Sequence, residues 1–231
     1  MNPNNHFNPA TSEDIVIYGS GAMAETLFSY IVQDHNVIAF VCEDEYCLTS
    51  NICHLPLIPL SEFIHQFSNK DVTIAIAVGF SEMNDIRKRI TDTLKNQGFK
   101  LFRFIHKSFE LHRNVTVGEF GFILNNTTIH CNSRIGDSVF IASGVNIGHD
   151  CVVGDYSWLN SGVSLAGGVS IGEHCFMGVN ACVAHGVSVA PYTYIGANTL
   201  VTKNTQLGDV VVTQAGETFD FDSKAYLAWL K

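Results

Sequence analysis

Residues 117–201 read VGEFGFILNNTTIHCNSRIGDSVFIASGVNIGHDCVVGDYSWLNSGVSLAGGVSIGEHCFMGVNACVAHGVSVAPYTYIGANTLV. Every sixth residue from Val117 to Val201 is aliphatic, and no insertion interrupts the series. A period of six matches neither the 3.6 residues of a helical turn nor the two-residue alternation of a strand. It is the hexapeptide repeat of a β-helical solenoid. Leu111 and Ile105 continue the series toward the N-terminus.

The chain before the repeat has the pattern of a small parallel α/β sheet. Residues 14–18 read as a buried strand, Gly19-Ser20-Gly21-Ala22-Met23-Ala24 as a tight turn that opens a helix, and residues 37–41 as a second strand that ends in Glu43-Asp44. Glycines let the backbone approach a phosphate, and a helix N-terminus favours an anion. The pattern predicts a nucleotide site, although a turn that needs glycines only for its backbone would look the same.

The remaining N-terminal elements are helices at 61–67 and 82–96 and strands at 72–78 and 100–105. A full dinucleotide domain needs two such halves, so this short domain favours a mononucleotide-type ligand over NAD. The predicted organisation is a loose leader at 1–12, a Rossmann-like domain at 13–104, a solenoid at 105–209 and an extension with a short helix at 210–231.

Composition excludes several classes of protein. The net charge is −9 with no cluster of Lys and Arg, which argues against nucleic acid and anionic membrane surfaces as partners. The longest apolar run, 72–80, is too short to span a bilayer. Seven cysteines without paired spacing predict reduced thiols in the cytoplasm. A zinc site at Cys47, Cys53 and His54 would lack a fourth ligand, so no metal is expected.

The repeat predicts columns of side chains, because three six-residue faces make a coil of 18 residues. One outward column is aromatic, and its members are Phe122, Phe140, Trp158, Phe176 and Tyr194. Such a stripe either stabilises the coil as a ladder or forms a contact surface. We predict a subunit interface on this column.

His149 stands out among the histidines of the solenoid. Gly167 lies one coil above it and leaves room beside the imidazole, while Asp150 can orient the ring. His130, His174 and His185 lack this combination and are predicted to be structural or surface residues. The pattern predicts a general base at His149.

The segments 148–155 and 165–172 resemble bacterial sugar acyltransferases, namely the sialic acid O-acetyltransferase-like proteins and the PglD-type nucleotide-amino-sugar N-acetyltransferases. The resemblance extends over nearly the whole chain. It implies a Rossmann-like domain followed by a left-handed β-helix, and a trimer.

The resemblance also implies roles for individual residues. His149 would be the base and Asp150 the acid that tunes it, and the Gly167 N–H would face the thioester carbonyl oxygen. Acetyl-CoA would lie between two subunits, near Gly167, Val179, Gly196 and Ala197. The nucleotide-linked sugar would lie near Gly19, Ser20, Gly21, Met23, Glu43, Asp44, Gly79 and Trp158.

The chain departs from the family pattern at four positions. Met23 stands where the family has a histidine, Glu25 where it has a basic residue, and Ala142 where it has an asparagine. Trp158 replaces a second histidine, so we expect the acceptor site to differ most there.

The predicted function is acetyl transfer from CoA to the amino group of a nucleotide-linked amino sugar, in surface-glycan biosynthesis. The alternatives are O-acetylation of a sugar hydroxyl, a non-catalytic sugar-nucleotide scaffold and a nucleotide-dependent oxidoreductase. A metalloenzyme of the γ-carbonic anhydrase kind is a further alternative, which needs three converging histidines.

Overall fold

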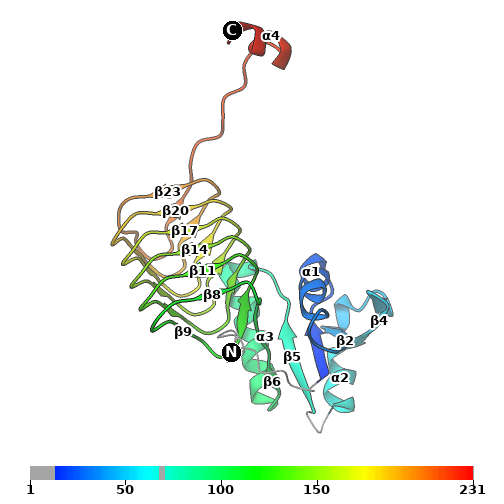
Figure 1. Cartoon of the computed structure of the whole chain (residues 1–231). Helices are drawn as coiled ribbons and strands as arrows, with labels where there is room; N and C mark the ends of the chain where they lie inside the picture. Colours follow the sequence, from blue (N-terminus) through cyan, green and yellow to red (C-terminus); the bar gives the residue numbers. More distant parts are fainter. Residues whose placement is uncertain (1–13, 68–70, 231) are drawn as a thin grey trace.

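The computed structural model describes residues 14–67 and 71–230. The predicted leader at 1–12 lies outside the described residues. An α/β domain packs against one side of a parallel β-helix, and the C-terminal segment leads away from the last coil (Figure 1). The predicted fold class is therefore confirmed.

The N-terminal domain is built on a six-stranded sheet with the order β3-β4-β2-β1-β5-β6. Its strands are β1 (Asp14–Tyr18), β2 (Val37–Cys42), β3 (Asn51–Ile52), β4 (Leu55–Pro59), β5 (Val72–Ile76) and β6 (Lys100–Leu101). Its helical segments are α1 (Ala22–Ile31), η2 (Asp44–Tyr46), α2 (Leu60–Gln66), η3 (Ser81–Asn84) and α3 (Asp85–Asn96). The sheet is parallel except for β3, which forms with β4 a hairpin that the sequence patterns did not predict.

The predicted helix at 82–96 begins three residues later than expected. Glu82, Met83 and Asn84 have φ angles of 50°, 49° and 72°, so the chain turns through the left-handed region before α3 starts. Left-handed backbone is unfavourable for residues other than glycine and ends regular helix. The expected strand at 100–105 is likewise divided into β6 and β7, and β7 joins the solenoid.

The solenoid has three parallel sheets, one on each face. The aromatic face consists of β7 (Arg103–Ile105), β10 (Gly121–Ile123), β13 (Val139–Ile141), β16 (Trp158–Leu159), β19 (Phe176–Met177), β22 (Tyr194–Ile195) and β24 (Val210–Val211). The β14 face consists of β8 (Glu110–Leu111), β11 (Thr128–Ile129), β14 (Asn146–Ile147), β17 (Ser164–Leu165), β20 (Cys182–Val183) and β23 (Leu200–Val201). The β15 face consists of β9 (Thr116–Val117), β12 (Arg134–Ile135), β15 (Val152–Val153), β18 (Ser170–Ile171) and β21 (Ser188–Val189).

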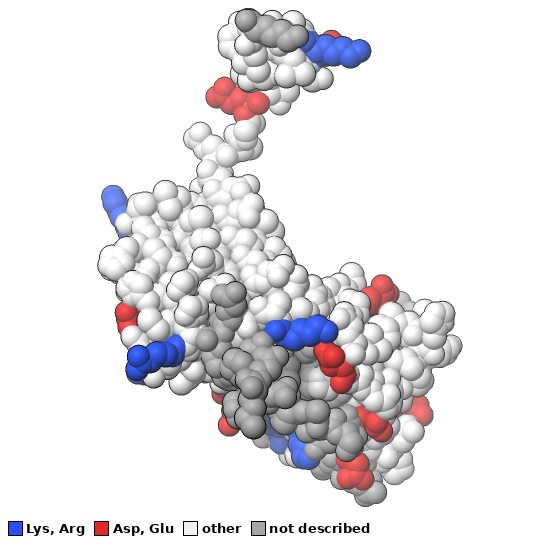
Figure 2. All heavy atoms as spheres, viewed as in Figure 1, with Lys and Arg blue, Asp and Glu red and all other residues white. Residues whose placement is uncertain are grey.

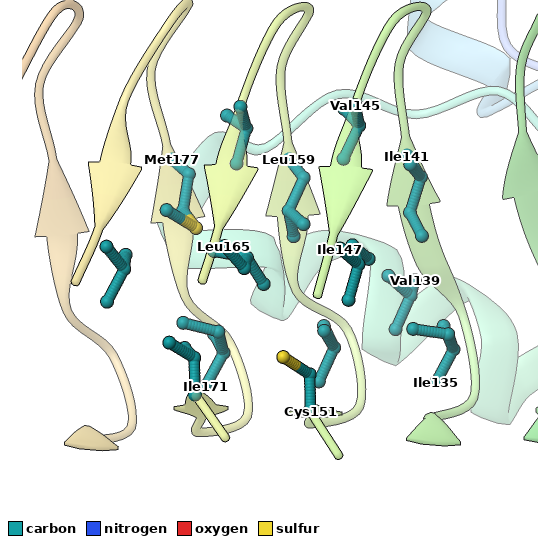
Figure 3. Packing of buried hydrophobic residues seen from close by; sticks show 14 of the residues in the cluster. Ile135, Val139, Ile141, Val145, Ile147, Cys151, Leu159, Leu165, Ile171 and Met177 are labelled. Carbon is teal, nitrogen blue, oxygen red and sulfur yellow. The ribbon is translucent and has the colours of Figure 1, made fainter. Parts of the chain in front are cut away.

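The 18-residue coil predicted from the period is confirmed by the strand register. Ile147 pairs with Leu165, and Leu165 with Val183, so each residue lies next to the residue 18 positions later. The aliphatic side chains of all three faces point into one stacked core (Figure 3). Burial of this continuous core stabilises strands that are only two or three residues long.

The prediction that the aromatic column forms a trimer interface is wrong. Phe122, Phe140, Trp158 and Phe176 are each exposed by 5% or less, because the N-terminal domain of the same chain covers them. They share one buried cluster with α1 and the N-terminal sheet. The stripe is apolar, as the sequence indicated, but it is an interdomain surface.

Polar contacts complete this interdomain surface. The buried Arg87 of α3 donates from Nη2 to the carbonyl oxygen of Tyr156 at 2.9 Å, and its guanidinium lies 5.2 Å from the Trp158 ring centroid. Burial lowers the pKa of Arg87 to about 9. His174 is buried in the solenoid between the rings of Tyr156 and Tyr192, and its Nδ1 lies 3.1 Å from the carbonyl oxygen of Met83 in the N-terminal domain. The Tyr192 hydroxyl donates to Asp85 Oδ1 at 3.1 Å. These contacts join the two domains into one packed unit.

The C-terminal segment carries the predicted short helix, α4 (Ser223–Trp229). The Asp222 side chain accepts hydrogen bonds from the N–H groups of Lys224 and Ala225, as a helix N-cap does. Figure 1 shows this helix away from the coils.

None of the helices in the described ranges is long and apolar enough to cross a membrane.

Candidate active site

His149 lies at the corner of the solenoid between the β14 face and the β15 face. Gly167 occupies the same place in the next coil, and a Cβ atom there would lie 2.4 Å from His149 Nε2. Any side chain at residue 167 would therefore occupy the space of the imidazole. The ring centroid of His185, one coil further, is 6.5 Å from that of His149. The room that Gly167 leaves in this column is occupied by the His149 ring itself.

Asp150 orients the imidazole from the same corner. Its Oδ2 lies 2.7 Å from His149 Nδ1, and its Oδ1 accepts a hydrogen bond from Asn132 Nδ2 at 3.0 Å. These two hydrogen bonds hold the pKa of Asp150 below its usual value. The ionised carboxylate assigns the Nδ1 position as the protonated one, so Nε2 keeps its lone pair, and the face of the ring lies against Gly167.

A short ladder of side chains supports Asp150 from below. Asn114 donates from Nδ2 to Asn132 Oδ1 at 3.0 Å, and Asn132 in turn donates to Asp150. All three residues have left-handed φ angles between 56° and 62°, which Asn and Asp tolerate better than most residues. Both asparagines lie at the 18-residue spacing of Asp150, so the repeat could have indicated this ladder, but neither was predicted to belong to the site.

The corner also presents a backbone donor. The N–H of Gly168 donates to the carbonyl oxygen of His149 at 2.8 Å, which fixes the two coils against each other. Among the described residues, none accepts a hydrogen bond from the N–H of Gly167. A lone-pair acceptor and an available donor thus share one open, water-accessible corner.

A second candidate site is a pocket of about 600 Å³ at the carboxyl ends of β1, β2 and β5. Six residues predicted to contact a sugar nucleotide line it: Gly19, Ser20, Gly21, Met23, Glu43 and Gly79. Gly19 has a φ angle of 141°, and a Cβ atom there would lie 2.6 Å from the Ala77 carbonyl oxygen. Glu43 accepts a hydrogen bond from the Tyr18 hydroxyl at 2.6 Å. Burial and this carboxylate raise the pKa of Tyr18.

Two residues predicted for this pocket lie elsewhere. Asp44 is turned away from it and accepts a hydrogen bond from the Ser61 N–H at 3.1 Å, beside the start of α2. Trp158 is 2% exposed beneath the N-terminal domain, so it has no open surface for a substrate. Its ring stacks on Phe140 at 3.9 Å. Cys42, Tyr46 and Arg89 also line the pocket, although no sequence pattern predicted them there.

The residues predicted to contact CoA occupy two different corners. Gly167 lies at one edge of the β14 face, whereas Val179, Gly196 and Ala197 lie at the other edge. Val179 is 46% exposed, and Gly196 is covered by Val212. One chain does not bring these residues together at a single corner.

The described residues contain no group of three His, Cys, Asp or Glu side chains that could hold a metal ion. His149 and His185 approach each other, but no third ligand of this kind joins them within the described part of the chain.

Comparison with known proteins identifies the repeat and the fold. Residues 168–203 match the family model for the hexapeptide repeat of succinyl-transferase. No curated protein sequence matches the chain. A variant of perosamine N-acetyltransferase from Caulobacter crescentus, solved with CoA and GDP-perosamine, is 26% identical, with a TM-score of 0.79 over 88% of this chain and 95% of that one.

Two further solved structures share the fold. The acetyltransferase domain of PglB from Neisseria gonorrhoeae is 21% identical, with a TM-score of 0.77 over 87% of this chain and 97% of that one. WeeI from Acinetobacter baumannii is 21% identical, with a TM-score of 0.76 over 86% of this chain and 96% of that one.

The repeat and the fold are those of the hexapeptide-repeat acetyltransferases to which the chain is similar, and the resemblance found in the sequence is confirmed. Within that class, the chain is similar to the perosamine N-acetyltransferase of Caulobacter crescentus.

Proposed function

We propose that this protein transfers the acetyl group of acetyl-CoA to the amino group of a sugar linked to a nucleoside diphosphate. The observation that carries the proposal is the exposed His149 imidazole, which lies over Gly167 and whose Nδ1 is hydrogen-bonded to Asp150, so that Nε2 is left to accept a proton. The similar Caulobacter crescentus enzyme, solved with CoA and GDP-perosamine, supports the choice of donor and acceptor. Its N-acetyltransferase activity favours an amine over a hydroxyl as the acceptor.

The proposed reaction uses the two groups at this corner. The sugar amine attacks the thioester carbonyl carbon while His149 Nε2 takes a proton from the nitrogen. The N–H of Gly167 stabilises the oxyanion of the tetrahedral intermediate. The C–S bond then breaks, and the imidazolium returns the proton to the CoA thiolate. Asp150 keeps the imidazole in the tautomer with the proton on Nδ1, which these reaction steps require.

The position of the nucleotide pocket implies that two subunits build each active site. The N-terminal domain covers the aromatic face, whereas His149 lies at the corner opposite that face. A sugar held in the pocket therefore reaches the His149 of another subunit. The two CoA-contacting corners on either edge of the β14 face would likewise come from neighbouring subunits.

The β14 face supports a homotrimer built on this face instead of the aromatic one, because it carries no charged residue in its outward column from β11 to β23. The outward residues of these five strands are Thr128, Asn146, Ser164, Cys182 and Leu200. Leu200 is 63% exposed in the single chain. Figure 2 shows few charged side chains over the coils in this view. Depletion of charge is typical of interface cores.

The product, an acetylated sugar nucleotide, would serve cytoplasmic steps of surface-glycan assembly.

The test is the His149→Ala variant, assayed for thiol release with acetyl-CoA and GDP-, UDP- and dTDP-linked amino sugars. We expect kcat to fall about 10²- to 10⁴-fold, which is the usual contribution of general base catalysis. The matched control is His130→Ala, which removes a histidine one coil lower whose ring stacks on His112. Wild-type turnover by the His149→Ala variant would rule out the proposed mechanism.

A further inference from the structure

Arg89 is the only cationic residue among those that line the nucleotide pocket. The other charged residues that line it are the carboxylates Glu43 and Glu45. Arg89 lies on α3 with Ile86 and Ile90, three and one residues away, and these three side chains form one wall of the pocket. The positive charge of this pocket therefore comes from α3 and not from the glycine turn.

The order of the strands indicates how a nucleotide is oriented in the pocket. Strand β1, which leads into Gly19, lies between β2 and β5. Glu43 follows β2 on one side, and Gly79 follows β5 on the other. A carboxylate after the second strand suits ribose hydroxyls, and a glycine turn suits phosphates. A nucleotide oriented in this way points its diphosphate toward the side of the pocket that α3 lines.

The glycine turn itself offers no cationic side chain to a diphosphate. The charged residue in the first turn of α1 is Glu25, and Gly21 caps the helix without a side-chain hydrogen bond. The N–H groups at the start of α1 can contact phosphate oxygens, but they do not balance two negative charges in a pocket that also holds Glu43 and Glu45. A diphosphate in this pocket needs a nearby cation.

Arg89 has a competing partner in the structure. Its Nη1 lies 3.0 Å from Glu82 Oε2, and the two side chains are 64% and 59% exposed. Exposed ion pairs of this kind are weak, whereas a guanidinium binds phosphate oxygens through paired, charge-assisted hydrogen bonds. Glu82 belongs to the left-handed turn that precedes α3, so its carboxylate is held close to the helix by the backbone.

We propose that Arg89 binds the diphosphate of the sugar nucleotide, and that Glu82 competes with the diphosphate for this guanidinium. This inference rests on the proposed function in so far as the ligand is a nucleoside diphosphate derivative. It makes Arg89 a binding residue and Glu82 a residue that weakens binding. The two residues should therefore have opposite effects on affinity when their charges are removed.

The experiment is calorimetry of the full chain with GDP, UDP and dTDP. Arg89→Gln should weaken binding of the preferred diphosphate about 10- to 100-fold, the range expected for hydrogen bonds to a charged group. Glu82→Gln should strengthen binding about 2- to 5-fold, because it removes an exposed ion pair. In the double variant the Glu82 substitution should have no further effect, since its partner is absent.

Lys88→Gln is the matched control. It removes the same charge from the neighbouring position of α3, where Lys88 pairs with Asp92 at 2.6 Å, and it should leave the affinity unchanged. If Lys88→Gln lost as much affinity as Arg89→Gln, the loss would be due to the net charge of the domain and not to a contact of Arg89, and the inference would be overturned. Unchanged affinity in Arg89→Gln, weaker binding in Glu82→Gln, or no binding of any of the three diphosphates to the wild-type chain would also overturn it.

Acetyl transfer is measured separately, so that the two proposals can fail independently. Diphosphate binding with the predicted response to Arg89→Gln, but without acetyl transfer to any nucleotide-linked amino sugar, would contradict the proposed function alone. Transfer with the same KM in wild type and Arg89→Gln would contradict the role of Arg89 alone.

Discussion

Gly19 and Gly167 both occupy positions where a Cβ atom has no room, but the obstacles differ. At Gly19 the obstacle is backbone, the carbonyl oxygen of Ala77, and the φ angle of 141° excludes most other residues. At Gly167 the obstacle is the imidazole of His149, and the backbone itself would accept a side chain. The first glycine is required by the fold of the N-terminal domain, and the second only by the site.

The largest effect should come from Gly167→Ala. The new methyl group would push the His149 ring away from Asp150, and misplacing a catalytic group by about 1 Å can cost roughly 10²-fold in rate. We expect kcat to fall at least about 100-fold while the melting temperature stays near that of the wild type. Thiol-release kinetics and calorimetric melting measure the two quantities.

Gly186→Ala is the control for this substitution, because Gly186 lies one coil above Gly168, next to the same corner, and no atom lies within 4 Å of its added Cβ. Its φ angle of 69° predicts a stability cost of about 1–2 kcal/mol with retained activity. If Gly167→Ala kept wild-type turnover, Gly167 would not be required by the site, and the distinction between Gly19 and Gly167 would fail.

A smaller effect, on stability, should follow Gly19→Ala. The contact with Ala77 and the unfavourable φ angle should cost about 2–4 kcal/mol in the N-terminal domain. Denaturant unfolding monitored by circular dichroism should show the loss. Gly21→Ala has open space around its Cβ and should change the free energy of unfolding by less than about 0.5 kcal/mol. Equal stabilities of the two variants would contradict the role given to Gly19.

The smallest effect should be the response of stability to pH. Burial lowers the pKa of His35, and burial followed by the charge of Lys107 lowers the pKa of His106. The folded state then binds fewer protons than the unfolded state, so stability is complete above the ordinary histidine pKa and is lost as the pH falls below it. Melting temperatures at pH 7.5 and 5.5 should show the decline.

His35→Gln should reduce this decline, whereas the exposed His65→Gln should leave it unchanged. A melting temperature that rises on acidification would contradict the prediction. His35 packs on Phe102 at a centroid distance of 5.0 Å, and His106 of the first coil lies 5.9 Å from the Tyr30 ring of α1, so the acid-sensitive groups lie in the N-terminal domain and where it meets the solenoid, away from Gly167.

The sequence predicted the solenoid and the opening at Gly167 because both follow from one period. Columns 18 residues apart place Gly167 over His149 without any knowledge of side-chain packing. The same columns identified the aromatic stripe, but a hydrophobic pattern indicates only that a surface is buried. It does not indicate whether another subunit or, as found, another domain covers that surface.

The pocket was predicted less completely, because its side chains come from elements far apart in the chain. Asp44 follows β2 as expected, but the 3₁₀ turn at residues 44–46 directs its carboxylate toward Ser61. Arg89 reaches the pocket from α3, about 70 residues after the glycine turn, and no local pattern distinguishes it from the neighbouring Lys88.

The regular coil also constrains how this chain can change in length. Deleting one residue from the solenoid would shift every later side chain by one place and turn core residues outward, so deletions are tolerated in whole coils of 18 residues. Deleting 159–176 would keep the fold in register but bring His185 directly above His149 in place of Gly167. Two proteins that differ by this single coil would share an architecture, and only the longer one would retain the opening beside its histidine.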